Sequence, residues 1–334
     1  MKTHAWAAAL ILAGAAGALT AAKLPFTHLR IGAATDASVT VQGGTVLMGG
    51  STDVDAAFAW MCQRSRGGDF LIVRASGTDA YNPYVRDVCS AAGAPPNSVS
   101  TLIVSTQTGA NDPRVAAIVR QAEAVWFAGG DQSVYVQAWK GTALQQALNE
   151  RIAAGVPVGG TSAGLNVLTQ FIYSATASKG ATSSQALADP FHRTMTFDRD
   201  LLAVPQLAGV IGDPHFAERD RMGRDLAFLC RVHAAGWSAT PRGIAVDEQT
   251  ALLIEPGGRA TVTGLGSVYF LQAPAGGPEV CAPGLPLTYR NIAAYRIEAG
   301  TTSFSLPSWS GSGGTAYTVS AIQGAISASG GLIY

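Results

Sequence analysis

The sequence has little charge, and the charge that it has is balanced. Only 13% of its 334 residues are charged, against ~25% in an average domain. Lysine plus arginine total 22 and aspartate plus glutamate total 22, so the formal net charge is zero. Without a basic surface the chain is not expected to bind nucleic acid. The 48% of hydrophobic residues is enough for a folded core, which argues against a disordered chain.

Beyond its first residues, the sequence has no apolar run long enough to span a bilayer. Residues 5–22 are apolar or small and uncharged, and Lys23 and Pro25 follow them. This pattern is typical of a secretory signal peptide that is cut after a small residue near Ala22. We therefore predict a signal peptide over residues 1–22, a secreted or periplasmic protein, and no membrane attachment after cleavage. An uncleaved N-terminal anchor is the alternative.

Cysteine is scarce, with four residues, and none of them has metal-ligand spacing. There is no C-x-x-C motif and no close group of His and Cys, so we expect neither a metal nor a cofactor. In an oxidising compartment an even number of cysteines favours disulfides. Chain order favours the pairs Cys62–Cys89 and Cys230–Cys281, and four buried free thiols are the alternative.

From Val41 onward, apolar strands alternate with amphipathic helices. The expected strands are "GTVLMGG", "DFLIVRAS", "SVSTLIVST", "AVWFAGGDQ" and "VPVGG". Between them lie helical segments, one of which opens with Asp112 as N-cap and Pro113 at the first helical position. This alternation predicts an α/β fold with a doubly wound, mostly parallel sheet of the flavodoxin-like type.

After about Gly243 the pattern changes to consecutive short strands with turn glycines, which predicts a β-rich region of hairpins. Residues 299–334 contain no charged side chain and are rich in Ser, Gly and Thr. We predict one domain over residues 23–298 and, over 299–334, a β appendage or a loosely packed tail.

The segment "GGTSAG" at residues 159–164 places a serine between a predicted strand and a predicted helix. Ser162 is the centre of a G-x-S-x-G element, Gly160 to Gly164. Glycines at these positions allow a sharp turn that exposes the hydroxyl, and the next amide, that of Ala163, lies at a helix N-terminus. We interpret Ser162 as a nucleophile; a plain tight turn is the alternative.

A serine nucleophile needs a general base, and the sequence offers five histidines. His215 follows an apolar run that ends at Gly212, and a helix is expected from near Ala217, which places His215 at the carboxyl end of a strand. His233 falls inside that helix, where a surface or capping role is more natural. We predict that His215 is the base.

A third group should orient the imidazole. Glu248 lies between two apolar runs in "GIAVDEQTALL", with Asp247 as its competitor, and a hairpin turn would also explain the pair. The resulting chain order is Ser, His, Glu, whereas an α/β-hydrolase has Ser, acid, His. The order therefore disfavours a general α/β-hydrolase esterase.

With these motifs in view, the sequence resembles the serine peptidases that include cyanophycinase and bacterial aspartyl dipeptidase, which have a class I glutamine amidotransferase-like fold. The resemblance covers residues 41–271 and rests on "FAGGDQ", "GGTSAG", "DPHFAERDRMGRDL" and "GIAVDEQTALL". It implies that Ser162 is the nucleophile, His215 the base and Glu248 the third member of the triad.

The resemblance also implies the rest of the site. The region of Gly130 and Asp131, with Ala163, would supply the amides of an oxyanion hole. Five further residues would surround a substrate pocket: Gln132, Asp213, Arg219, Arg221 and Arg224. Arginines suit a substrate with a free α-carboxylate, which a guanidinium binds bidentately. The alternative is a solvated helix, because Glu218, Asp220 and Asp225 alternate with the arginines.

The chain departs from the family pattern at Pro214, where cyanophycinases carry glutamine between the aspartate and the histidine. The continuation "LNVL" after "GTSAG" replaces a more alanine-rich one. The resemblance therefore implies a serine exopeptidase for cyanophycin or similar β-aspartyl-arginine peptides. The alternatives are a peptidase for isoaspartyl or N-terminal aspartyl peptides and a non-catalytic extracellular binding module. A homodimer is a further expectation.

Overall fold

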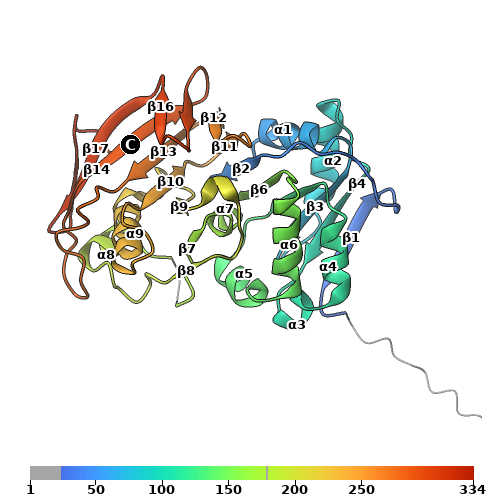
Figure 1. Cartoon of the computed structure of the whole chain (residues 1–334), viewed down its shortest axis with the longest axis horizontal. Coiled ribbons are helices and arrows are strands. Elements are labelled where there is room, and N and C mark those ends of the chain that lie inside the picture. The colour runs from blue at the N-terminus through green and yellow to red at the C-terminus, as the bar shows by residue number, and fades with distance from the viewer. Residues whose placement is uncertain (1–23, 178–179) are drawn as a thin grey trace, which may run out of the picture.

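The computed structural model describes residues 24–177 and 180–334, so the predicted signal peptide lies outside the described residues. Its strands form two sheets, one of 10 strands and one of 8. Figure 1 shows the N-terminal part of the chain, blue to green, on one side and the C-terminal strands, orange to red, on the other. The short helix α7 lies between them.

Five parallel strands form the centre of the first sheet, in the order β4-β3-β5-β6-β2. They are β2 (Thr45–Met48), β3 (Asp69–Arg74), β4 (Ser98–Ile103), β5 (Ala124–Phe127) and β6 (Val158–Thr161). Each corresponds to one of the five apolar runs in the sequence, which confirms the predicted α/β class. A sixth strand, β1 (Thr27–Gly32), pairs antiparallel with β4 at the edge and was not anticipated.

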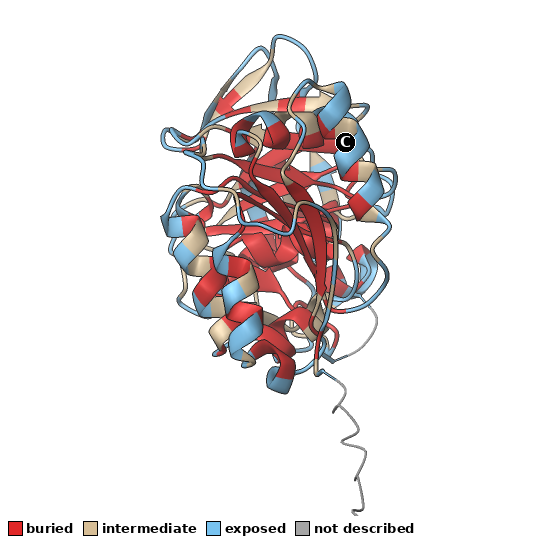
Figure 2. Cartoon of the chain, turned by 90° about the vertical axis from the view of Figure 1, so that its right-hand side faces the viewer, coloured by how far each residue is buried: buried red, intermediate tan, exposed pale blue. Residues whose placement is uncertain are grey.

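Helices cover both faces of this sheet. One face packs against α1 (Asp55–Ser65) and α2 (Tyr81–Ala91). The other packs against α3 (Gln107–Ala110), α4 (Pro113–Arg120), α5 (Gln132–Trp139) and α6 (Ala143–Ala153). Figure 2 shows that the strands at the centre of the molecule are buried, while the helices expose their outer sides. No helix in the described ranges is both long and apolar enough to cross a membrane.

The strands read as continuous apolar runs because both of their faces are covered. In β3, Phe70 and Ile72 contact the core beneath α1 and α2, whereas Leu71 and Val73 contact the core beneath α4 to α6. The period-2 alternation of the strand thus divides one apolar run between two cores.

Both disulfides that chain order favours are present. Cys62 of α1 is bonded to Cys89 of α2, with their Cα atoms 5.4 Å apart. Cys230 is bonded to Cys281, with their Cα atoms 6.1 Å apart. The alternative of four free thiols is therefore wrong, and the first bond ties together the two helices that cover one face of the sheet.

The second sheet has the order β18-β17-β14-β13-β10-β9-β7-β8. Its strands are β7 (Phe171–Tyr173), β8 (Phe197–Arg199), β9 (Val210–Asp213), β10 (Arg242–Val246), β13 (Ser267–Gln272), β14 (Tyr289–Glu298), β17 (Thr315–Ile322) and β18 (Ala325–Ala328). It packs against α8 (Ser183–Ala188) and α9 (Met222–Ala234). A 3-10 helix, η1 (Pro205–Leu207), precedes β9.

The β-rich region is only in part a series of hairpins. β11 (Thr250–Ile254) and β12 (Arg259–Gly264) pair antiparallel across a tight turn. However, β10 and β11 are not a hairpin, because β10 belongs to the second sheet and β11 to the first. The chain crosses between the sheets at residues 247–249, where the sequence suggested a simple turn.

Residues 299–334 add strands to both sheets. β15 (Ser303–Ser305) and β16 (Ser310–Ser312) extend the first sheet, and β17 and β18 extend the second. Phe304 and Val319 are buried in the two cores. These residues are therefore packed, in spite of their lack of charge.

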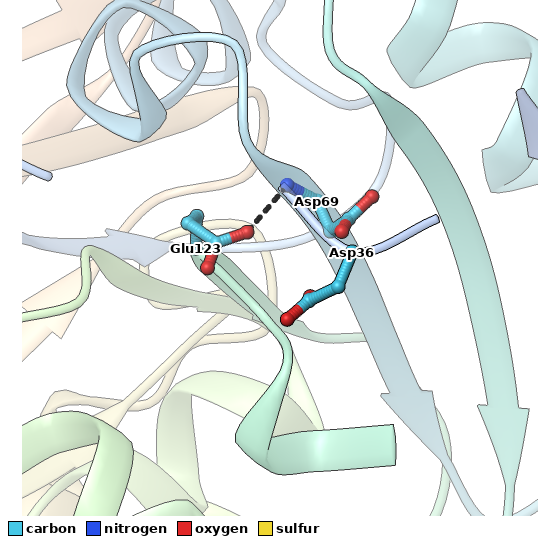
Figure 3. A group of neighbouring side chains, drawn as sticks. All are labelled: Asp36, Asp69 and Glu123. Atoms are coloured by element: carbon cyan, nitrogen blue, oxygen red, sulfur yellow. Dashed lines mark hydrogen bonds between the residues drawn. The ribbon is translucent and has the colours of Figure 1, made fainter. Parts of the chain in front are cut away.

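Three carboxylates lie together at the start of β3 (Figure 3): those of Asp36, Asp69 and Glu123. Asp69 already accepts hydrogen bonds from Arg30 (2.9 Å), Asn97 (2.9 Å) and Ser98. Because its oxygens are committed to these protein donors, we assign no metal site here. Figure 3 also shows the Asp69 amide donating to Glu123, at 2.8 Å.

The pKa of Glu123 is shifted by its surroundings. Burial, together with the negative charges of Asp69 and Asp36, raises the pKa of Glu123 from its ordinary 4.5 to about 7, in spite of the hydrogen bond from the Asp69 amide. A folded-state pKa above the unfolded one contributes stability that is complete below pH 4.5 and is lost as the pH rises through about 7.

We therefore predict that Glu123→Gln stabilises the protein at high pH. Glutamine keeps an acceptor for the Asp69 amide but cannot ionise. We expect the variant to exceed the wild type in free energy of unfolding by about 1–3 kcal/mol near pH 8, and by little near pH 5. Urea unfolding at both pH values measures this, with exposed Glu298→Gln as control. An equal gain at both pH values would contradict the prediction.

Candidate active site

Ser162 lies on a strained turn between β6 and α7 (Ala163–Leu168). Its backbone has φ 54° and ψ −113°, a conformation that residues other than glycine rarely adopt. The amide of Ser162 donates to the carbonyl oxygen of Met48, at 3.1 Å. The strand–turn–helix context that the G-x-S-x-G motif predicts is therefore present.

The two glycines of the motif are required by close backbone contacts. A Cβ atom at Gly160 would lie 2.6 Å from the carbonyl carbon of Gly164. A Cβ atom at Gly164 would lie 1.9 Å from the carbonyl oxygen of Phe127. Side chains at either position would push α7 away from the ends of β5 and β6, and the serine would move with it.

The three predicted polar side chains form one hydrogen-bonded chain. Ser162 Oγ lies 2.7 Å from His215 Nε2, and His215 Nδ1 lies 2.6 Å from Glu248 Oε1. Nδ1–H donates to the carboxylate, which leaves Nε2 as an acceptor for the serine hydroxyl. The imidazole is thus oriented to take the proton of Ser162.

A pair of glycines at the end of β2 makes room for this histidine. A Cβ atom at Gly50 would lie 2.2 Å from His215 Cε1, and one at Gly49 would lie 1.9 Å from the carbonyl oxygen of Asp247. The His215 amide also donates to the Gly49 carbonyl, at 2.9 Å. Sequence reasoning missed these residues, although a double glycine at the end of a predicted strand was a usable signal.

The competing residues have other partners. Asp247 is buried, and its carboxylate accepts hydrogen bonds from the amides of Ala217 and Ser267, both at 2.9 Å. His192 Nδ1 lies 2.8 Å from Thr194 Oγ1, and His233 packs against Gly277, where a Cβ atom would be 2.4 Å from its Nε2. Asp247 therefore anchors the segment after His215 and is not the orienting carboxylate.

The electrostatics of the chain suit a neutral base beside an ionised acid. Burial lowers the pKa of His215, and the charges of Arg219 and Arg221 lower it further, against the opposing hydrogen bond to Glu248. Burial raises the pKa of Glu248, but the hydrogen bond from His215 and the charge of Arg219 outweigh it, so this pKa is lowered. Nε2 is therefore free to accept a proton at neutral pH.

A cavity of about 240 Å³ opens in front of Ser162. Most of the residues that the sequence assigns to substrate and oxyanion binding line it: Gly130, Asp131, Gln132, Arg219, Arg221 and Arg224. The turn at residues 129–131 lies against the serine, since a Cβ atom at Gly129 would be 3.6 Å from Ser162 Cβ. Ala163 is buried in the first turn of α7.

Asp213 is not a substrate contact, contrary to the expectation. It is fully buried beneath the cavity and does not line it. Arg224 Nε donates to Asp213 Oδ2 at 2.8 Å, and Arg224 Nη2 binds the other carboxylate oxygen. Asp213 thus neutralises and holds Arg224, which is itself only 3% exposed.

The helix expected from near Ala217 begins later, at Met222. Arg219 and Arg221 therefore lie in a turn, and the solvated-helix interpretation is wrong for them. Arg221 Nη1 donates to the Pro214 carbonyl at 2.6 Å and lies 3.5 Å from Asp213 Oδ1. Burial lowers the pKa of Arg221 to about 10, so it is still charged at neutral pH.

Four cavity residues were not anticipated, and two of them, Asn166 and Tyr173, carry polar side chains. Asn166, one turn after Ser162 in α7, is buried, and its Oδ1 has no hydrogen-bond partner among the described residues. Tyr173 closes another wall, and its carbonyl accepts a hydrogen bond from Gln132 Nε2 at 3.3 Å. Asparagine in an otherwise apolar helical run was the available signal for Asn166.

The parallel α/β fold and a serine–histidine–glutamate arrangement at its strand ends define the class of serine-type peptidases. Residues 41–262 match the model of Peptidase family S51. The chain belongs to this family.

Curated relatives agree with the family assignment, and a solved structure has a similar fold. The chain is 27% identical over 207 residues to a cyanophycinase of Trichormus variabilis, covering 60% of this chain and 63% of the relative. It is 28% identical over 214 residues to a cyanophycinase of Synechococcus elongatus, covering 62% and 60%. A crystal structure of a peptidase from an acI-B1 Actinobacterium has a similar fold, with TM-score 0.52, 17% identity, and coverage of 79% of this chain and 97% of that one.

The lowered pKa of His215 predicts how the reactivity of Ser162 depends on pH. A fluorophosphonate probe reacts with a serine only while its base is neutral, so labelling should remain fast below pH 6.5, the ordinary His value, and fall about tenfold per unit only at lower pH. Arg219→Gln removes a positive charge near His215. We therefore expect the pH below which labelling slows, the acid limb of the profile, to rise by up to about one pH unit.

Rates of labelling between about pH 4 and 8 measure the limb, with Arg199→Gln as a control that lies outside the cavity. If labelling of the wild type already slows above pH 6.5, or if Arg219→Gln has the same pH profile, the His215 pKa is not lowered in the way described.

Proposed function

We propose that the protein is an exported serine exopeptidase that hydrolyses cyanophycin or similar β-aspartyl-arginine peptides. The observation that carries the proposal is the Ser162–His215–Glu248 chain at the edge of a cavity lined by three arginines. Export rests on the sequence of residues 1–22 and suits a polymer that is too large to enter a cell. Homodimer assembly remains an expectation.

In the proposed mechanism, Ser162 Oγ attacks the scissile carbonyl while His215 Nε2 takes its proton. Glu248 stabilises the imidazolium that forms. The amides of Gly130, Asp131 and Ala163 would donate to the oxyanion; the position of both segments beside the serine supports this role. The imidazolium then protonates the leaving amine, and water hydrolyses the acyl-enzyme through the same base.

The charges of the cavity support a substrate with a carboxylate. Asp213 neutralises Arg224, whereas Arg221 is bound mainly to the neutral carbonyl of Pro214. Arg221 therefore keeps most of its charge for a ligand, and Arg219 is 52% exposed and within 3.4 Å of Glu248. A free α-carboxylate at the end of a peptide is the group that such guanidinium groups bind well.

The relatives support the choice of substrate, since the curated proteins that match are named cyanophycinases. The matched stretch spans less than two thirds of their length, so the activity of the whole protein is part of the proposal. A peptidase for isoaspartyl or N-terminal aspartyl peptides is the second candidate, favoured by Pro214 in the cavity wall. The complete hydrogen-bonded triad disfavours a non-catalytic binding module.

The decisive experiment incubates the protein with insoluble cyanophycin and, separately, with isoaspartyl dipeptides, and identifies the soluble products. We expect β-aspartyl-arginine from the polymer. Ser162→Ala should reduce turnover by at least about 10⁴-fold with the fold retained, because it deletes one hydroxyl at a solvent-accessible turn. Circular dichroism and thermal unfolding check the fold. Substantial turnover by Ser162→Ala would exclude Ser162 as the nucleophile.

Pro214 offers a second, more specific test. Proline lacks the two donors and the acceptor of a glutamine side chain beside His215. If the substrate leaves a polar group unpaired there, the cost is about 1–3 kcal/mol, so Pro214→Gln should improve kcat/KM on cyanophycin about tenfold or more. Pro214→Leu, which adds volume without an amide, is the control. If the wild type ignores cyanophycin and glutamine does not rescue it, the second candidate stands.

A further inference from the structure

Tyr334, the last residue of the sequence, packs against the segment that follows His215. Its ring meets those of Phe216 and Tyr269 edge-on, with centroids 5.6 Å and 6.2 Å away. Its hydroxyl accepts a hydrogen bond from the Met222 amide at 2.9 Å and donates to Asp220 Oδ1 at 2.8 Å. The family match ends at residue 262, so this contact comes from a part of the chain outside it.

The segment that Tyr334 contacts is the arginine turn, residues 216–221. It carries Arg219 and Arg221 into the cavity and begins directly after the base. The Arg221 amide donates to the Phe216 carbonyl at 3.0 Å, and Asp220 is held at φ 48°. Aspartate adopts this left-handed conformation at a smaller cost than most other non-glycine residues, and contacts from other elements stabilise the turn further.

Three elements supply that support. The Asp247 carboxylate binds the Ala217 amide at the start of the turn. The Ser183 hydroxyl, at the start of α8, donates to the Asp220 carbonyl. Tyr334 binds both the Asp220 side chain and the Met222 amide, and thus joins Asp220 to the first residue of α9.

The Tyr334 hydroxyl remains protonated and can hold both of its hydrogen bonds to the turn. Burial raises the pKa of Tyr334 well above its usual value, and the hydrogen bond to Asp220 and the charge of that carboxylate raise it further. The hydroxyl therefore keeps its proton at neutral pH and can donate it to Asp220.

We infer that the Tyr334 hydroxyl is a positioning group that holds the arginine turn in its binding geometry, so that a residue outside the cavity controls substrate affinity. The inference rests on the proposed function for its kinetic consequence, but not for the contact itself. Tyr334 does not line the cavity, and its hydroxyl binds Asp220 and Met222, which do not line it either, so it acts through the turn.

The test compares Tyr334→Phe with Tyr317→Phe. The first variant keeps the ring contacts and loses only the two hydrogen bonds to the turn. The second loses a hydroxyl that donates to the Ile333 carbonyl at 3.2 Å, and so it perturbs the same end of the chain without touching the turn. Neither residue lines the cavity, and both variants retain the whole chain.

For Tyr334→Phe we expect KM for a β-aspartyl peptide to rise about fivefold to tenfold, with kcat within about twofold of the wild type. Labelling of Ser162 by a small uncharged fluorophosphonate at pH 8 should be unchanged, because His215 is neutral at that pH and the probe has no carboxylate for the arginines to bind. Hydrogen exchange at the Met222 amide and in the arginine turn should be faster. Tyr317→Phe should show none of these effects.

An unchanged KM, unchanged exchange, or equal effects of the two variants would overturn the inference, and so would a matching loss in fluorophosphonate labelling, which would indicate a general structural role. If the wild type cleaves none of the peptides, the proposed function fails separately. Binding of β-aspartyl-arginine to the Ser162→Ala protein, with and without Tyr334→Phe, then replaces KM as the readout. Equal affinities in that comparison would also overturn the inference.

Discussion

Three consecutive carbonyl groups at the end of β2 hold the active site together. The Met48 carbonyl accepts the amide of Ser162, the Gly49 carbonyl accepts that of His215, and the Gly50 carbonyl accepts that of Gln249, next to Glu248. Each member of the triad, or its direct neighbour, is therefore tied to the same short piece of backbone. Only glycine fits at residues 49 and 50, because a Cβ atom would meet Asp247 or the His215 ring. Residues that carry no chemistry of their own thus set the distances on which the chemistry depends.

This arrangement explains why the triad is drawn from both sheets. Ser162 ends a strand of the first sheet, His215 follows β9 of the second, and Glu248 lies where the chain passes from the second sheet to the first. Two hydrophobic cores must therefore be in register for the hydrogen bonds of 2.7 Å and 2.6 Å to form. Short hydrogen bonds tolerate little displacement, so packing far from the serine contributes to catalysis through the position of the histidine.

The elements that the sequence predicts well are those with local causes. The five parallel strands are predicted from apolar runs that are buried on both faces. The sharp turn at Ser162 is predicted from the two glycines of the motif, where a side chain would clash with nearby backbone. Four features escaped: β1, the role of Gly50, the crossing at residues 247–249, and the late start of α9. Each depends on contacts between residues far apart in the chain, such as the Asp247 carboxylate that binds the Ala217 amide in the turn before α9. Asp213 was misassigned for the same reason, since a motif shows that a residue matters but not on which side of the cavity wall it lies.

Burial determines how the charged groups beneath the cavity pair with one another. Asp213 and Arg224 are both removed from solvent, and such a pair is stable only if the two charges satisfy each other. Asp225 is buried nearby, and burial together with the charge of Asp213 raises its pKa well above the ordinary value, which favours its neutral form beside the Asp213 carboxylate. Asp213 is therefore already committed to Arg224 and lies at 3.5 Å from Arg221. The guanidinium groups that Asp213 does not neutralise, those of Arg219 and Arg221, thus lie on the turn that follows His215. The geometry of that turn therefore bears more directly on what the cavity binds than the geometry of the buried pair does.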